Sequence, residues 1–251
     1  MNAKATKIGF KNYSMCLRDA VAVFTKELIN CLFDAQYREE KEAHTKSKFL
    51  VILERLSIKN QDCFWLDFEK SFTEIRRKLD LDALAAYNSD PAAKSLREVY
   101  LAYPGFYAIA VYRLSTQLLA QGIAVLPRMM SEYAHGATGT DIHPGAQIGH
   151  SFFIDHATGI VIGETTIIKN NVTIFQGVTL GGIQAKKSMA FEKRHPTIED
   201  NVIVYANATI LGGNVVVGEN AVIGANVCIT ESVVKNSVVT LQSENKIFQR
   251  R

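Results

Sequence analysis

The chain has 251 residues, of which 47% are hydrophobic and 21% charged, and its formal net charge is +3. This length allows a full hydrophobic core in one or two domains. Because the lysines and arginines are scattered among acidic residues, nucleic-acid binding has little support. Residues 1–11 hold no apolar segment typical of a secretory signal, and no apolar run approaches the roughly 20 residues that cross a bilayer. The four cysteines form no CxxC pair, which fits reduced thiols. We therefore expect a soluble, cytoplasmic protein.

The first quarter of the chain carries apolar residues at helical spacing. This spacing predicts helices over about residues 14–33, 47–56 and 65–81. The highly charged segment 38–46 is interpreted as a solvated turn or a frayed helix. The apolar faces of the three helices are interpreted as core or subunit contacts, because such stripes usually pack against other elements.

A second group of helices precedes the middle of the chain. The sequence Asn88-Ser89-Asp90-Pro91 is typical of a helix start, because Asp or Ser caps a helix and Pro suits its first turn. We predict that a helix begins there and runs to Tyr103. Another helix is expected over about 106–121, followed by a short segment around 127–134.

The second half of the chain is a six-residue repeat. The repeating aliphatic positions are Ile142, Ile148, Ile154, Ile162, Ile168, Ile174 and Leu180, and then Tyr205, Leu211, Val217, Ile223 and Ile229. A period of six held over about fifteen units indicates short strands and tight turns stacked as a solenoid. We predict an α+β fold, with an α-helical domain over 1–138, a parallel β-helix over 139–240 and a short tail over 241–251.

One irregularity of the repeat lies between Ile154 and Ile162, which are eight residues apart instead of six. The two extra residues predict a bulge near 157–159. Bulges re-aim side chains and are frequent beside active sites. Asp155 and His156 lie in this bulge.

The second irregularity is a longer interruption of the repeat. After Leu180 the repeat resumes at about Glu199, an excess of 13 residues that we interpret as a loop around 183–196. Insertions of this kind often build the binding face of a repeat protein. The loop ends in Arg194 and His195.

These two places hold residue types suited to acid–base chemistry. His156 is the best candidate for a general base, because an unperturbed imidazole titrates near neutrality. Such a base works best when a carboxylate holds its other ring nitrogen. Asp141 lies 15 residues earlier, about one coil below His156 if a coil takes roughly three hexads. We expect the two side chains to be within reach of each other.

Further charged groups could bind a zwitterion. Asp90 and Asp155 offer carboxylates for an ammonium group, and Arg194 offers a planar cation for a carboxylate. His195 adds a second titratable group. Plainer interpretations exist for each residue: Asp90 as a helix cap, Arg194 and His195 as a charged loop end, and His156 as a surface histidine. The residues alone leave both interpretations open.

Four segments resemble the serine O-acetyltransferase family: 141–146 (DIHPGA), 155–165 (DHATGIVIGET), 178–182 (VTLGG) and 194–196 (RHP). The resemblance covers about residues 90–225. It implies a left-handed hexapeptide β-helix behind a helical domain, with acetyl-CoA as co-substrate and no metal. The implied product is O-acetylserine for cysteine synthesis.

The resemblance also implies roles for individual residues. His156 would take the proton of the serine hydroxyl, and Asp141 would orient its imidazole. The substrate-binding set would be Asp90 and Asp155 on the serine ammonium group, Arg194 on its carboxylate, and His195 against the hydroxyl or the thioester. The positions implied to line the coenzyme A groove are Gly181, Gly182, Ala206 and Ala225. The site would lie between subunits of a trimer, and two trimers often pair.

Two segments depart from the family pattern. The loop after Ile183 is longer than usual and includes Lys186, Lys187 and Phe191. The tail 246–251 lacks the apolar end with which family members insert into cysteine synthase, so we do not expect that partner.

Three alternative functions stay open. The same fold could acetylate another small hydroxyl or amino acceptor, such as homoserine, or could serve as a non-catalytic trimeric scaffold. A γ-carbonic anhydrase would need three histidines on zinc, and His150 and His156 are poorly spaced for that site.

Overall fold

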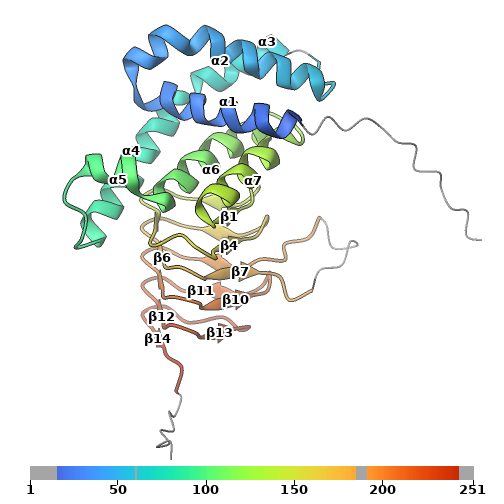
Figure 1. Ribbon diagram of the computed structural model, residues 1–251. Coiled ribbons are helices and arrows are strands. Elements are labelled where there is room, and N and C mark those ends of the chain that lie inside the picture. Colours follow the sequence, from blue (N-terminus) through green and yellow to red (C-terminus); the bar gives the residue numbers. More distant parts are fainter. Residues whose placement is uncertain (1–15, 60, 185–190, 243–251) are drawn as a thin grey trace, which may run out of the picture.

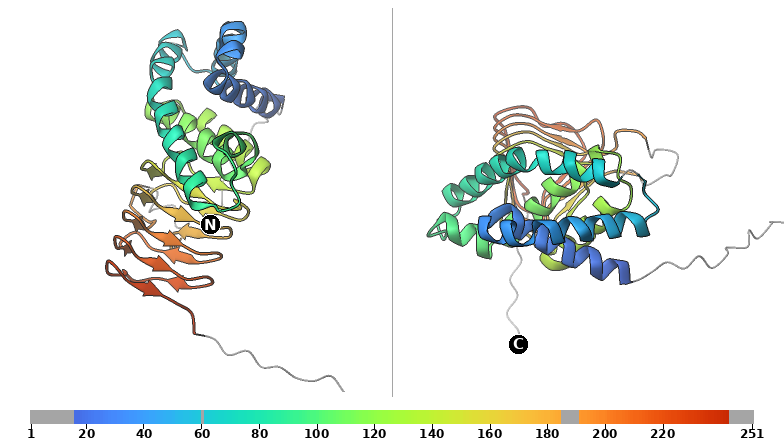
Figure 2. Two further views of the ribbon diagram at one scale, coloured as in Figure 1. Left: turned by 90° about the vertical axis from the view of Figure 1, so that its left-hand side faces the viewer. Right: turned by 90° about the horizontal axis from the view of Figure 1, so that it is seen from above.

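The computed structural model describes residues 16–59, 61–184 and 191–242. Helices occupy the first part of this region and stack on one end of a column of short strands (Figure 1). The helices are α1 (Cys16–Phe33), α2 (Ala35–Arg55), α3 (Gln61–Lys70), α4 (Phe72–Ser89), α5 (Leu96–Ala102), α6 (Pro104–Ala120) and α7 (Leu126–Thr138). Seen from above, they cover the end of the column (Figure 2).

The column is a parallel β-helix, as the six-residue repeat predicts. Its strands are β1 (Asp141–Ile142), β2 (Gln147–Ile148), β3 (Phe153–Ile154), β4 (Val161–Ile162), β5 (Ile167–Ile168), β6 (Thr173–Ile174), β7 (Thr179–Gly181), β8 (Thr197–Ile198), β9 (Ile203–Val204), β10 (Thr209–Leu211), β11 (Val216–Val217), β12 (Val222–Ile223), β13 (Cys228–Ile229) and β14 (Val238–Val239). Three parallel sheets result, in the orders β1-β4-β7-β10-β13, β2-β5-β8-β11 and β3-β6-β9-β12-β14. We call them the first, second and third sheets.

The helical part differs from its prediction in two places. Of the two interpretations of the charged segment 38–46, the turn is wrong and the helix holds, because the segment lies within α2, where Arg38 Nη2 pairs with Glu42 Oε1 at 3.1 Å, one helical turn away. The single helix predicted over 65–81 is divided between α3 and α4. At the break, the Ser71 hydroxyl donates a hydrogen bond to the Phe68 carbonyl, an alternative to the regular helical pattern.

Asp90 also differs from its interpretation as an N-cap. It is the C-cap of α4, and its Oδ1 accepts the Ala92 N–H at 2.8 Å in a local turn. The next helix begins only at Leu96, where Ser95 is the N-cap. Short polar side chains stabilise turns as readily as helix starts, so the residue types did not separate the two outcomes.

Two of the five predicted inward positions of the later coils, Tyr205 and Leu211, are offset by one, whereas Val217, Ile223 and Ile229 are buried as predicted. Val204 and Ile210 are fully buried, whereas Tyr205 is 41% exposed. The six-residue repeat did not reveal this offset, because the inward residue and the outward residue beside it are both hydrophobic there. Strand partners are 18 residues apart between Val161 and Thr179 but 30 apart between Thr179 and Thr209, so the inserted loop adds 12 residues, not 13.

Asparagines line one corner of the β-helix. Asn171, Asn201, Asn220 and Asn236 have φ between 57° and 60°, a left-handed conformation that Asn tolerates better than most residues. Each of the first three donates its side-chain N–H₂ to the next Oδ1, at 3.2, 3.1 and 2.9 Å. This ladder fixes the corner of successive coils.

Asn201→Ala should therefore lower the free energy of unfolding by about 1–2 kcal/mol, because alanine resists the left-handed conformation. Asn201→Gly, which relieves the backbone but also breaks the ladder, should lose less. Urea unfolding followed by circular dichroism compares the two variants. An alanine variant as stable as the glycine variant would contradict the backbone explanation.

A buried ion pair joins the helices to the first coil. Asp82 of α4 is 0% exposed and Arg113 of α6 is 4% exposed in their side chains, and Arg113 Nη2 donates to Asp82 Oδ1 at 2.8 Å. The same arginine nitrogen donates to the Gly149 carbonyl at 2.7 Å, and Asp82 Oδ1 accepts the Phe152 N–H at 2.9 Å. The pair thus orients the helical layer on the β-helix.

Candidate active site

His156 lies at the bulge that the eight-residue gap predicts. Asp141 and Val161 are strand partners 20 residues apart, two more than in the next coil, so the bulge adds the two expected residues. His156 and Ala157 have φ of 59° and 64°, and Thr140 Oγ1 donates to the Ala157 carbonyl at 2.9 Å. This turn buries Ala157 and leaves the His156 side chain 68% exposed.

Two of the predicted substrate-binding aspartates lie close to His156. His156 Nε2 is 3.6 Å from Asp155 Oδ2. Asp155 is partly buried, and this burial raises its pKa, with Asp90 adding to the rise and His156 opposing it. The hydroxyl of Tyr103, with the Ala92 N–H, lowers the pKa of Asp90. Two carboxylates and an imidazole thus form one group at the corner between the third and first sheets.

Asp141 lies on β1, beside this group. Its Oδ1 is buried without a hydrogen-bond partner among the described residues, although Arg128 Nη1 lies 3.6 Å away. Among the described residues, Asp141 Oδ1 makes no hydrogen bond to the His156 ring. The dyad stays a prediction, and the unsatisfied oxygen is an acceptor that an imidazole N–H would satisfy.

A second group forms where the inserted loop returns. Arg194 Nη2 donates to Glu164 Oε2 in an ion pair. Thr165, the next residue after Glu164, bonds to His195. The His195 ring packs on Gly163, where an added Cβ would lie 2.1 Å from the ring Cδ2. This group occupies the corner between the first and second sheets.

The predicted site residues are therefore divided between the two edges of the first sheet. The register of the third sheet and the turn hydrogen bonds place Thr158, Gln176, Ala206 and Ala225 in one row along the first edge, with His156 in the bulge just before Thr158. Gly181 and Gly182 lie with the second group, and a Cβ added at Gly182 would meet the Arg194 carbonyl at 3.2 Å. Within one chain, the width of the sheet separates the two groups.

Three residues that were not predicted from the sequence form hydrogen bonds or ion pairs with the predicted site residues. Tyr103 binds Asp90, Glu164 binds Arg194, and Thr165 binds His195. Glu164 and Thr165 end the same DHATGIVIGET run as His156, which is the signal that could have drawn attention to them. Tyr103 carried no such signal beyond the helix break that follows it.

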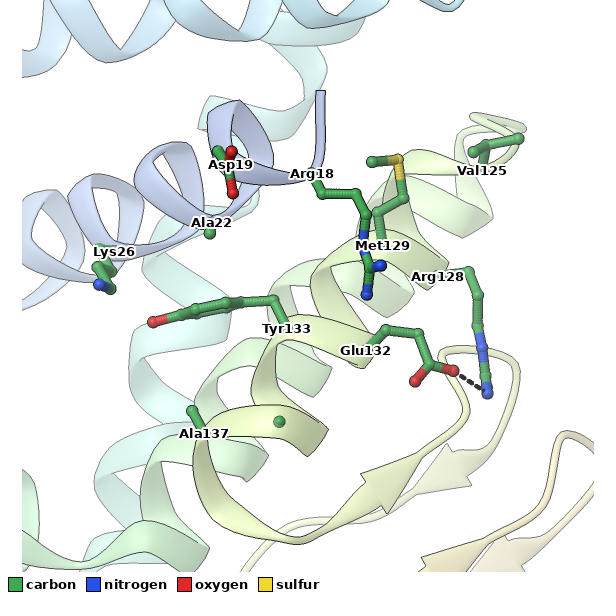
Figure 3. Close-up of a pocket in the computed structure, with 11 residues that line it drawn as sticks. Arg18, Asp19, Ala22, Lys26, Val125, Arg128, Met129, Glu132, Tyr133 and Ala137 are labelled. Atoms are coloured by element: carbon green, nitrogen blue, oxygen red, sulfur yellow. Dashed lines mark ion pairs between the residues drawn. The ribbon is translucent and has the colours of Figure 1, made fainter. Parts of the chain in front are cut away.

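A cavity of about 930 Å³ lies between α1 and α7, away from both groups. Figure 3 shows Arg18 and Lys26 of α1 facing Tyr133, Glu132 and Arg128 of α7. None of the predicted site residues lines this cavity. Of the lining residues, Arg128 approaches the site, with its Nη1 3.6 Å from Asp141 Oδ1.

No three or more His, Cys, Asp or Glu side chains among the described residues are grouped to hold a metal ion. None of their helices combines the length and apolar character needed to cross a membrane.

Comparison with known proteins identifies the family. Serine acetyltransferase of Helicobacter pylori is 49% identical over 123 residues, which cover 49% of this chain and 70% of the relative. The chain belongs to the serine acetyltransferase family. In structure, Entamoeba histolytica serine acetyltransferase 1 in complex with L-cysteine has a TM-score of 0.79 and 33% identity, covering 88% of this chain and 86% of that one. No family model matches.

The similarity to curated serine acetyltransferases is partial in length. The plasmid enzyme of Synechococcus elongatus is 49% identical over 150 residues, 58% of this chain and 47% of that protein. The Bacillus subtilis protein is 47% identical over 136 residues, 54% of this chain and 61% of that protein. The chain thus spans about half to three fifths of these first relatives. The fold of the family, a helical domain and a left-handed β-helix, is confirmed.

Proposed function

We propose that this chain transfers the acetyl group of acetyl-CoA to the hydroxyl of L-serine, giving O-acetyl-L-serine for cysteine synthesis. The observation that carries the proposal is the placement of Asp90 and Asp155 beside His156 in a member of the serine acetyltransferase family. A Neisseria gonorrhoeae member that is 30% identical, with a TM-score of 0.67, has been solved in complex with serine.

The proposed chemistry needs one base. His156 Nε2 takes the hydroxyl proton of serine while the serine oxygen attacks the thioester carbonyl carbon. The carbon–sulfur bond then breaks, and the coenzyme A thiolate receives the proton from the imidazolium. Asp141 Oδ1, which lacks a hydrogen-bond partner in the described chain, accepts the Nδ1–H of the imidazole and fixes its tautomer.

Substrate binding divides between the two groups. Asp90 and Asp155 bind the serine ammonium group, and Tyr103 keeps Asp90 in place. Arg194 exchanges Glu164 for the serine carboxylate, and His195 contacts the hydroxyl or the thioester oxygen. Because the groups lie at opposite edges of one sheet, we propose that the edge with His156 meets the edge with Arg194 of a second copy in a trimer or a dimer of trimers.

The pantetheine arm of acetyl-CoA is proposed to run between the same edges. Ala206 and Ala225 lie on the same edge as His156, in the row of Thr158 and Gln176, and Gly181 and Gly182 lie beside Arg194. Small residues allow a ligand to approach the backbone closely. The reaction uses acetyl-CoA as co-substrate and side chains alone as catalysts, and we place it in the cytoplasm.

A shared site predicts that two inactive variants can rescue each other. Chains with His156→Ala and chains with Arg194→Ala should each be nearly inactive, but co-expressed chains should regain about a quarter of the wild-type sites, because a random trimer pairs intact edges at that frequency. The assay is serine-dependent thiol release from acetyl-CoA by the purified mixture.

In the matched control, chains with His156→Ala are co-expressed with chains with Asp155→Ala. Both changes lie on the same edge of the sheet. No pairing of these chains creates an intact site, so this mixture should stay inactive. If the His156 and Arg194 mixture is equally inactive, the site lies within one chain. Wild-type activity with homoserine and none with serine would replace the proposed acceptor.

A further inference from the structure

Thr165 lies where the inserted loop returns to the β-helix. The Thr165 hydroxyl oxygen accepts the backbone N–H groups of Arg194 at 2.9 Å and of His195 at 3.1 Å. Lys193 Nζ donates to the Thr165 carbonyl at 3.1 Å and to the His195 carbonyl at 2.6 Å. One threonine therefore anchors the turn that presents both predicted substrate-binding residues.

The same hydroxyl also contacts the imidazole. Thr165 Oγ1 lies 2.9 Å from His195 Nδ1, and the Thr165 backbone N–H donates to that nitrogen at 3.1 Å. A hydroxyl has one proton and two acceptor sites. Both acceptor sites are used by the two backbone N–H groups, so the proton is left for Nδ1. A nitrogen that receives two donors cannot carry a proton itself.

We propose that Thr165 is a positioning residue that holds His195 as a neutral imidazole with its proton on Nε2. His195 then acts as a hydrogen-bond donor to a substrate oxygen and not as a second base. Resting on the proposed function, this assigns that oxygen to the acetyl thioester carbonyl, where negative charge develops during acyl transfer.

The surroundings of His195 favour the same state. Burial, chiefly, together with the nearby Arg194, Lys193 and His143, lowers its pKa to about 4, although Glu164 opposes the shift. A group with this pKa is neutral above about pH 5. The ring is also fixed in place, because Nε2 lies 2.2 Å from where a Cβ at Gly163 would stand.

The test uses Thr165→Val, which keeps the shape and removes the hydroxyl, and Thr165→Ser, which keeps the hydroxyl. In ¹⁵N-histidine-labelled full-length protein, with the signals assigned from His195→Gln, wild-type His195 should show an unprotonated Nδ1 and a protonated Nε2 with no titration between about pH 5.5 and 9. In Thr165→Val the proton should move at least partly from Nε2 to Nδ1, and in Thr165→Ser it should stay on Nε2.

Kinetics gives a second readout. Thr165→Val should lower kcat/KM for serine at least about 10-fold through a misplaced donor, and Thr165→Ser should stay within about threefold of wild type. A wild-type His195 that titrates near its ordinary value, or that carries its proton on Nδ1, would overturn the inference whatever the activity. A wild type that is silent with serine but shows the expected spectra would overturn the proposed function and support the tautomer.

Discussion

Replacing His156 with alanine is expected to lower kcat for acetyl transfer to L-serine by about 10²-fold or more. His156 is the exposed imidazole of the bulge, 3.6 Å from the Asp155 carboxylate, so Nε2 faces the proposed ammonium site. Without it, the serine hydroxyl keeps its proton and attacks the thioester poorly. The measurement is thiol release from acetyl-CoA with serine at saturating concentrations.

The matched control is His44→Ala, which removes an exposed histidine of α2. It should leave kcat unchanged. The two variants should have the same circular dichroism spectrum as the wild type, because neither histidine side chain packs in the core. A His156→Ala enzyme with wild-type kcat would remove His156 from the role of base and return it to a surface histidine.

Replacing Arg113 with methionine is expected to lower the free energy of unfolding by about 3–5 kcal/mol, because it leaves the Asp82 carboxylate buried without its partner. Asp82 is fully buried, and burial already raises its pKa, with Arg113 opposing the rise. Urea unfolding at constant pH measures the loss.

The loss should depend on pH in a defined direction. Without Arg113 the pKa of Asp82 in the folded chain rises further above its unfolded value, so the penalty falls as pH drops toward the unfolded value of about 4. The variant should thus lose less stability at about pH 4 than at pH 8. The control is Arg77→Met, which breaks the exposed pair with Glu74 and should change stability little. Equal losses in the two variants would contradict the assignment.

The period of the repeat was readable because each coil must bury its own aliphatic residues. Ile142, Ile162 and Leu180 recur at the spacing that stacks them, and the two-residue bulge appeared as a change of spacing. The offset of one residue at β9 could not be predicted, because Tyr205 has a large apolar ring and its buried neighbour Val204 is also hydrophobic. Local chemistry likewise left Asp90 open to two kinds of cap.

The sequence predicted which residues form the candidate site, but it did not predict how they are arranged in space. The sequence pointed to His156, Asp155 and Arg194 through breaks in the repeat and through resemblance, and their catalytic roles stay predictions. Nothing in the spacing showed that His156 and Arg194 lie at opposite edges of one sheet, because that depends on which corner each coil turns at.

By itself the sequence determined a helical domain followed by a β-helix, since a hydrophobic period is a local property that only one kind of stacking satisfies. The tertiary structure decided which side chains form hydrogen bonds with the predicted site residues and with the buried Asp82. Tyr103 reaches Asp90, Thr165 reaches His195 across 30 residues, and Arg113 reaches Asp82 in another helix. Polar side chains choose partners by geometry across distant segments, and no periodic pattern encodes that choice.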